Sequence, residues 1–149
     1  MELSYLKPYS TPLGQISDLV ASNTKEWKIQ SPVAEILSLD NNELLLLFDP
    51  TDVNYSGFVQ FMHDIDTGNK QWRDKYFPTS KHKQLTTGMK FDCKLHPTTD
   101  IFDASGCMSD HTKLLPKQRV VVMLKTPSVW ISKRNYGNTW SAHQIMLQE

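Results

Sequence analysis

Residues 119–147 read RVVVMLKTPSVWISKRNYGNTWSAHQIML, and this stretch contains the clearest fold signal in the chain. The run Arg119–Lys125 is rich in β-branched residues, as is typical of a fully buried strand. The segment Ser128–Arg134, the turn-forming residues 135–138 and the segment Thr139–Leu147 together predict a β-hairpin. We therefore expect the end of the chain to be β-structure.

Upstream segments add further predicted strands. Residues 89–95 alternate apolar with charged side chains, as expected of a half-buried strand. Two apolar runs, 33–39 and 44–48, flank the turn-forming residues 40–42 and predict a second hairpin, and residues 57–62 (GFVQFM) are another strand candidate. No segment has sustained helical periodicity. About five to seven strands predict an all-β fold, a small barrel or a sandwich, with long inter-strand insertions.

Polar segments define the expected domain organisation. Residues 1–27 contain two prolines and many Ser and Thr, so we expect them to form an irregular N-terminal arm. Residues 28–149 are expected to form a single β domain. Residues 64–88 and 97–116 are long polar insertions, and the first of these is expected to be either functional or partly helical.

The composition is that of a globular protein. The chain has 149 residues, of which 39% are hydrophobic, and this excludes a disordered chain. No apolar run is long enough to span a membrane, the first residues do not resemble a signal peptide, and two cysteines are too few for a disulfide scaffold. We therefore expect an intracellular protein with no membrane partner.

The formal net charge of zero is an average of two unlike halves. Residues 1–66 contain three basic and ten acidic side chains, whereas residues 67–149 contain thirteen basic and six acidic ones, so their charges are −7 and +7. No Asp or Glu lies between His111 and His143. This asymmetry indicates an anion-binding face, unless the fold mixes the two halves into an even surface.

Aromatic and basic side chains are interleaved in two places, the first insertion and the final hairpin. Exposed rings stack on bases for about 1–3 kcal/mol each while Lys and Arg neutralise phosphates, which is the chemistry of single-stranded nucleic-acid binding. The candidate binding residues are Trp72, Arg73, Lys75, Tyr76, Lys81, Lys83, Lys125, Trp130, Lys133, Arg134, Tyr136 and Trp140. The alternative for each tryptophan is a place in the core. Tyr136, beside a turn glycine and two cations, is the better stacking candidate.

The end of the chain also resembles a known family. The pattern VWISKR–YGNTWSAHQIML is similar to the closing hairpin of OB-fold single-stranded DNA-binding proteins from large DNA viruses and phages. The resemblance covers residues 119–147 and implies a small OB-like barrel that binds single-stranded DNA largely independently of sequence. It also implies a role in replication or recombination, protein partners from those processes, and a place in the host cytoplasm or nucleus.

The cysteines and two histidines suggest a metal site. Cys93 and His96, then Cys107 and His111, have the spacing of two ligand pairs of a tetrahedral zinc site. Zinc would restrain the second insertion, which has few apolar residues. Alternatively, Cys93 is in phase with Phe91 and is a buried core thiol, in which case no cofactor is expected.

Catalytic signals are weak. The sequence has no nucleophile elbow, phosphate-binding loop, zinc-protease motif or dinucleotide fingerprint, so we do not expect an enzyme. Two alternatives to single-stranded DNA binding stay open. One is RNA binding, because stacking does not distinguish the sugar. The other is a β-sandwich structural or adaptor domain of a multiprotein, viral assembly, in which the acidic half of one copy meets the basic half of the next and gives a homo-oligomer.

Overall fold

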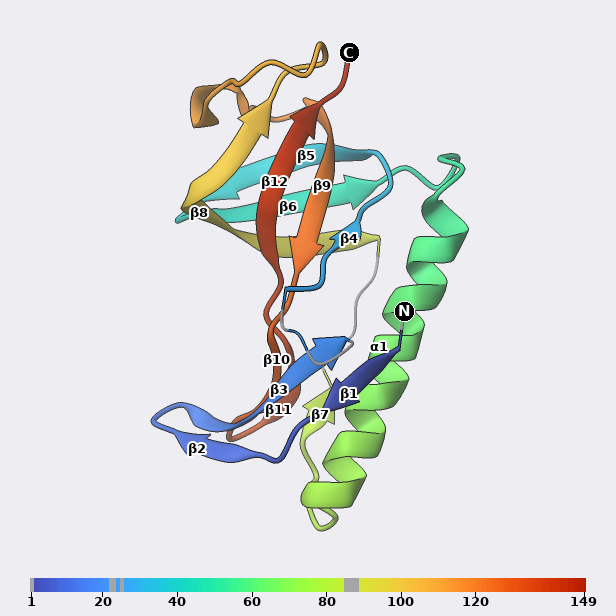
Figure 1. The fold of residues 1–149 in the computed structure, drawn as a ribbon, viewed down its shortest axis with the longest axis vertical. Helices are drawn as coiled ribbons and strands as arrows, with labels where there is room; N and C mark the ends of the chain where they lie inside the picture. The colour runs from blue at the N-terminus through green and yellow to red at the C-terminus, as the bar shows by residue number, and fades with distance from the viewer. Residues whose placement is uncertain (1, 22–23, 25, 85–88) are drawn as a thin grey trace. The chain divides into compact units, whose positions relative to one another are not determined.

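The computed structural model describes residues 2–21, 24, 26–84 and 89–149. The chain forms two compact units, each assembled from three separate segments of sequence (Figure 1). We call the first the half-barrel unit; its segments are 1–27, 61–87 and 126–139. We call the second the barrel unit; its segments are 28–60, 88–125 and 140–149. No helix in the part of the chain that the structure describes is long and apolar enough to cross a membrane.

The barrel unit is a small, closed, OB-like barrel, as expected. Its strands are β5 (Ala34–Asp40), β6 (Glu43–Phe48), β8 (Lys90–Phe102), β9 (Arg119–Lys125) and β12 (Ser141–Leu147), with β4 (Ile29–Gln30) paired to β9. The order around the barrel is β5-β6-β8-β12-β9, and β9 pairs again with β5. Strands β8 and β12 are parallel and the other neighbours are antiparallel. The short helix η1 (His111–Lys113) lies between β8 and β9 in the sequence.

Alternation of side chains along the strands fills this barrel. On β9, Val120, Val122 and Leu124 are fully buried, and Leu44 and Leu46 of β6 are equally inaccessible. Because successive strand residues point to opposite faces, these apolar residues form one continuous core while their neighbours reach the surface. The strand predicted at 89–95 and the hairpin predicted over 33–48 are both confirmed.

The half-barrel unit combines a half-barrel sheet with most of a long helix. Its strands are β1 (Leu3–Tyr5), β2 (Tyr9–Thr11), β3 (Gly14–Ala21), β7 (Lys83–Gln84), β10 (Ser128–Ile131) and β11 (Asn135–Asn138). The order is β1-β3-β10-β11-β7, and β2 also pairs with β3. Helix α1 (Tyr55–Tyr76) enters this unit at Phe61.

One helix residue anchors α1 on the sheet. Trp72 packs in a buried cluster with Val129, Ile131 and Tyr136. Its indole Nε1 donates a hydrogen bond to Ser17 Oγ at 2.9 Å, so the ring is both buried and satisfied. The first insertion is therefore partly helical because its apolar residues need a sheet to cover them.

Three expectations about secondary structure are wrong. Residues 1–27, expected to be an irregular arm, contain β1, β2 and β3. Residues 57–62, expected to be a strand, lie in α1. Residues 135–138, expected to be a turn, form β11 and pair with β10, whereas β12 pairs with β8 and β9 instead of returning along residues 128–134. In each case long-range pairing or packing overrides the local pattern.

Candidate nucleic-acid interface

The fold sorts the charged residues into units of opposite sign. The half-barrel unit contains nine Lys and Arg and six Asp and Glu, a formal charge of +3. The barrel unit contains seven basic and ten acidic side chains, a formal charge of −3. The two sequence halves are therefore partly mixed. The net positive charge lies in the unit built from the N-terminal segment, the first insertion and residues 126–139.

Two basic clusters from distant parts of the sequence meet in the half-barrel unit. Strands β7 and β11 are parallel, with Lys83 beside Asn135 in the register. The backbone N–H of Lys83 donates to the carbonyl oxygen of Arg134 at 2.9 Å. Lys81 and Lys133 flank this contact in the sequence, and all four basic side chains are exposed. The fold thus joins clusters that are about 50 residues apart in the chain.

A hollow of about 790 Å³ adjoins these basic residues. Three segments line it: the turn between β2 and β3, the end of α1 with the loop after it, and the end of β10. The lining residues are Thr11, Pro12, Leu13, Gly14, Gln15, Tyr76, Phe77, Pro78, Thr79, Ser80, Lys81, His82, Ile131, Ser132 and Lys133. Of the described residues that line it, none is Asp or Glu. The volume lies in the range of ligand sites, and the lining favours an anion.

Gly14 allows β3 and β10, which form two walls of the hollow, to approach each other closely. It has a φ of +143°, and a Cβ at this position would lie 2.1 Å from the carbonyl oxygen of Ile131. The hydroxyl of Thr11 donates to the carbonyl oxygen of Gly14 at 2.8 Å and closes the turn. Only glycine permits both this backbone conformation and this close approach of β3 to β10.

The third wall is the loop that follows α1. The N–H of Ser80 donates to the carbonyl oxygen of Phe77 at 3.0 Å, and the N–H of His82 donates to Ser80 Oγ at 3.1 Å. Ser80 Oγ is also hydrogen-bonded to Nδ1 of His82. Arg73 donates from a guanidinium nitrogen to the carbonyl oxygen of His82 at 3.3 Å. These bonds fix the loop that presents Lys81 to solvent.

Two rings contribute aromatic surface to the hollow. Tyr76 and Phe77 line it and are half-buried, and both pack against the Trp72 cluster. The rings of Phe77 and Trp72 meet edge to face, with centroids 5.4 Å apart. A ring that is fixed on one side and half exposed on the other loses little entropy when a base stacks on it.

Three rings among the predicted binding residues are instead core residues. Trp72 and Tyr136 are buried in the half-barrel unit, and Trp140 is buried in the barrel unit with its ring centroid 5.9 Å from that of Phe91. Tyr136 is 3% exposed, so, contrary to the expectation, its ring is not available for stacking. It is buried because it pairs with Ile131 across β10 and β11 and faces α1.

Arg73 has a structural role in the half-barrel unit. Its guanidinium lies 5.2 Å from the ring centroid of Tyr136 and forms an ion pair with Asp74 at 2.9 Å. Together with its bond to His82, these contacts join α1 to the loop and to β11. Burial raises the pKa of Tyr136, and the Arg73 charge opposes that rise.

The remaining predicted binding residues lie outside the hollow. Trp130 is half-buried, and its Nε1 donates to Thr139 Oγ1 at 3.0 Å. Lys75 is exposed, with Nζ 5.1 Å from the ring centroid of Tyr76. Lys125, at the end of β9, belongs to the barrel unit.

The structure places the four predicted zinc ligands in different environments. Cys93 points into the barrel core, where burial raises the pKa of its thiol to about 12, whereas Cys107 is exposed. Nε2 of His96 is hydrogen-bonded to Ser141 Oγ at 3.1 Å, and Nε2 of His111 to the carbonyl oxygen of Thr99 at 2.9 Å. Strand β8 continues through Pro97, so Cys93 and His96 face opposite sides. Within the described ranges, no group of three or more His, Cys, Asp or Glu is placed to hold a metal.

The N-terminal contribution to this interface is not among the residues predicted from the sequence. The turn of β2 and β3 forms one wall of the hollow, and Phe77, His82 and Ser132 complete it. A signal for that turn is present, because Pro12 begins the two-residue connection between Thr11 and Gly14, and a glycine follows it. The hairpin is hard to recognise from the sequence because β2, on one side of the turn, has only three residues.

Comparisons with known proteins add no identification: no family model matches this chain, nor does any curated protein or solved structure. The resemblance of residues 119–147 to OB-fold single-stranded DNA-binding proteins therefore stays a prediction.

Proposed function

We propose that this protein binds single-stranded DNA, largely independently of sequence, through the hollow of the half-barrel unit and the exposed cations beside it. The principal supporting observation is that the fold brings Lys81, Lys83, Lys133 and Arg134 together next to a hollow whose described lining contains no carboxylate. The OB-like barrel is the other unit, so its fold does not by itself support a binding site in the half-barrel unit.

In the proposed mode, phosphates and bases are bound by different groups. The four basic side chains contact successive phosphates and release their counterions, which gives affinity without reading sequence. Tyr76 and Phe77 offer half-exposed ring surface on which a base can stack. A duplex keeps its bases stacked inside, so it would gain only the phosphate contacts. We therefore expect single strands to bind more tightly than duplex.

Titration of labelled oligothymidine, followed by fluorescence anisotropy at several salt concentrations, tests this proposal. Four phosphate contacts predict a slope of log affinity against log salt of about −3 for a single strand. A slope near zero, or duplex binding as tight as single-strand binding, would contradict the proposal. An oligouridine arm of the same titration measures the preference for DNA over RNA.

The resemblance at the end of the chain would place this activity in replication or recombination. The chemistry of the hollow is compatible with that role, because proteins that cover transient single strands use phosphate contacts and stacking in place of base-edge hydrogen bonds.

A further inference from the structure

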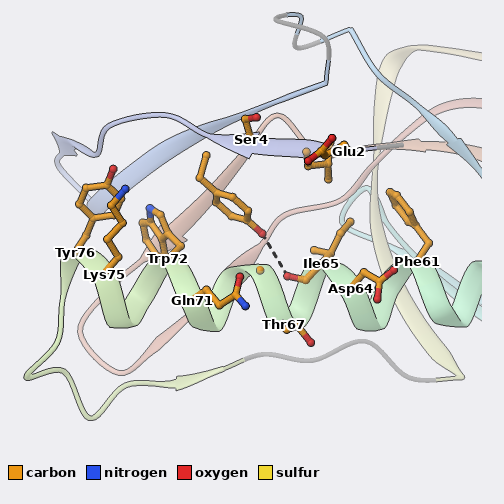
Figure 2. A pocket seen from close by; sticks show the side chains of 13 residues that line it. Glu2, Ser4, Phe61, Asp64, Ile65, Thr67, Gln71, Trp72, Lys75 and Tyr76 are labelled. Atoms are coloured by element: carbon orange, nitrogen blue, oxygen red, sulfur yellow. Dashed lines mark hydrogen bonds between the residues drawn. The ribbon is translucent and has the colours of Figure 1, made fainter.

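A second cavity of the half-barrel unit lies between β1 and α1. It encloses about 590 Å³ and shares only Tyr76 with the hollow described above. Its lining comes from one strand and one helix, as Figure 2 shows. The lining residues are Glu2, Leu3, Ser4, Tyr5, Phe61, Asp64, Ile65, Thr67, Gly68, Gln71, Trp72, Lys75 and Tyr76. We call it the β1–α1 groove.

One wall of the β1–α1 groove is a sheet edge. Among the described strands, β1 pairs with β3 alone and ends the sheet. The N–H of Leu6 donates to the carbonyl oxygen of Asp18 at 3.0 Å, and the N–H of Leu19 donates to Pro127, on the other side of β3. Hydrogen-bonded and non-hydrogen-bonded pairs alternate along antiparallel strands, so Leu3 and Tyr5 direct their backbone N–H and C=O groups away from β3.

The other wall is a polar stripe on α1. Asp64, Thr67, Gln71 and Lys75 recur at intervals of three or four residues, so they lie along one side of the helix, and all four are exposed. Figure 2 places Glu2 near the Asp64 end of the groove and Lys75 near the opposite end. The groove is thus acidic at one end and basic at the other.

Contacts of Tyr5 hold the two walls at a fixed spacing. Its hydroxyl donates to Asn69 Oδ1 at 2.9 Å and lies 3.3 Å from the carbonyl oxygen of Ile65, the bond drawn in Figure 2. A Cβ on Gly68 would come within 2.5 Å of that hydroxyl, so glycine is needed where the ring meets the helix. A preformed groove lowers the ordering cost of a ligand that binds in it.

We propose that the β1–α1 groove binds an extended peptide segment of a partner protein, which pairs antiparallel with β1 and extends the sheet. Strand addition supplies partners for the outward N–H and C=O groups of Leu3 and Tyr5. The charges set the direction: an acidic side chain of the peptide lies near Lys75 and a basic one near Glu2 and Asp64. From Asp64 to Lys75 the helix rises about 16 Å, which about five strand residues span.

Two peptides of equal composition test the proposed direction. In antiparallel pairing, EVTVTVK places its acidic end near Lys75 and its basic end near Glu2, whereas KVTVTVE places each charge beside its like. We expect EVTVTVK to bind at least tenfold more tightly in an NMR titration of ¹⁵N-labelled protein, with shift changes at the amides of Leu3 and Tyr5. Equal affinity of the two peptides, or no binding of either, would overturn the proposal.

Variants of the protein separate backbone pairing from charge. Leu3→Pro removes an outward N–H that β3 does not use and should abolish EVTVTVK binding, whereas Leu3→Ala keeps that N–H and should bind within about threefold of the unchanged protein. Unaltered binding by Leu3→Pro would refute strand addition.

Charge inversion provides a test that does not depend on the folding of the proline variant. Glu2→Lys and Asp64→Lys combined with Lys75→Glu should reverse the preference between the two peptides, and an unchanged preference would contradict the assigned direction. None of these measurements contains nucleic acid, so their outcome is independent of the proposed function.

Discussion

Gly14 shows how much of the candidate interface depends on a single backbone position. Its positive φ and its contact with the Ile131 carbonyl leave no space for a side chain. We predict that Gly14→Ala lowers the free energy of unfolding by about 2 kcal/mol or more, because it forces β3 and β10 apart. Urea denaturation of both proteins measures this difference.

Gly57 is a matched control for that substitution. It lies in the first turns of α1, and, apart from its chain neighbours and the backbone of its own helix, no heavy atom lies within 4 Å of the position that a Cβ would occupy. Gly57→Ala should therefore raise stability by about 0.5–1 kcal/mol, because alanine has the better helix propensity. If the two substitutions change stability alike, the close approach of β3 to β10 at Gly14 does not require glycine.

The two cysteines should differ in reactivity. Burial raises the pKa of the Cys93 thiol to about 12, so at pH 8 it is protonated and inaccessible, whereas Cys107 is exposed. We predict that a disulfide reagent modifies one thiol per folded chain at pH 8 and that Cys107→Ser abolishes this reaction. Prompt modification of two thiols without denaturant would show that Cys93 is not buried.

The raised pKa of Cys93 also predicts how stability depends on pH. Below the ordinary thiol pKa of 9.0, the thiol is protonated in both the folded and the unfolded chain, so the stability that the buried neutral thiol contributes is fully present. Between 9.0 and about 12 the unfolded chain loses its proton first, so stability falls as pH rises. Cys93→Ala should reduce this alkaline loss, and an unchanged pH profile would contradict the raised pKa.

At the scale of elements, a chain of hydrogen-bonded polar side chains joins α1 to β1, at one end of the half-barrel sheet, and to β10 and β11 within it. Asn69 is fully buried; it accepts a hydrogen bond from the Tyr5 hydroxyl at 2.9 Å and donates to Asn138 Oδ1 at 2.7 Å. Asn138 in turn donates to the carbonyl oxygen of Ser128 at 3.0 Å. The helix thus connects β1 with β10 and β11 through satisfied polar groups.

Removing the central amide should destabilise the protein more than its size suggests. Asn69→Ala removes one hydrogen-bond partner from each of Tyr5 and Asn138 next to a buried site, so we predict a loss of about 2–3 kcal/mol in the free energy of unfolding, measured by urea denaturation. Gln71→Ala, two residues along the same helix and exposed, should cost less than about 0.5 kcal/mol. Equal costs for the two variants would contradict this role of Asn69.

The elements also show what local sequence determines. Alternation over residues 89–95 predicts β8 because one face of that strand is buried and the other exposed. Helix α1 was missed although Phe58, Met62 and Ile65 recur at helical spacing, because the apolar residues are few and the buried Asn69 interrupts the pattern. Its stability comes from the sheet that covers it, which no local window contains.

Only part of the interface could be predicted from the sequence, because only part of it depends on local residue type. The cations around Lys81 and Lys133 are visible in the sequence because clusters of Lys and Arg are nearly always exposed. Which rings accompany them was not predictable, since burial of Tyr136 depends on its pairing with Ile131 and its packing against α1. The contact between Lys83 and Arg134 requires β7 and β11 to pair, which only the whole fold specifies.

At the scale of the whole molecule, charge is distributed by structural unit. The formal charge is +3 in the half-barrel unit and −3 in the barrel unit, so the zero total conceals a basic unit with a hollow suited to anions. Units of opposite sign also favour the association of one copy with another at low salt. Light scattering without DNA would reveal such association and should accompany every binding experiment.

Paired substitutions of equal charge change test the central claim most directly. Lys133→Ala with Arg134→Ala removes two cations from the proposed interface, whereas Lys113→Ala with Lys117→Ala removes two exposed cations from the barrel unit. We predict that the first pair halves the salt slope for oligothymidine and weakens binding at least tenfold at low salt, while the second pair leaves both within about twofold. Equal effects of the two pairs, or no effect of the first, would contradict the assignment of single-stranded DNA binding to the half-barrel unit.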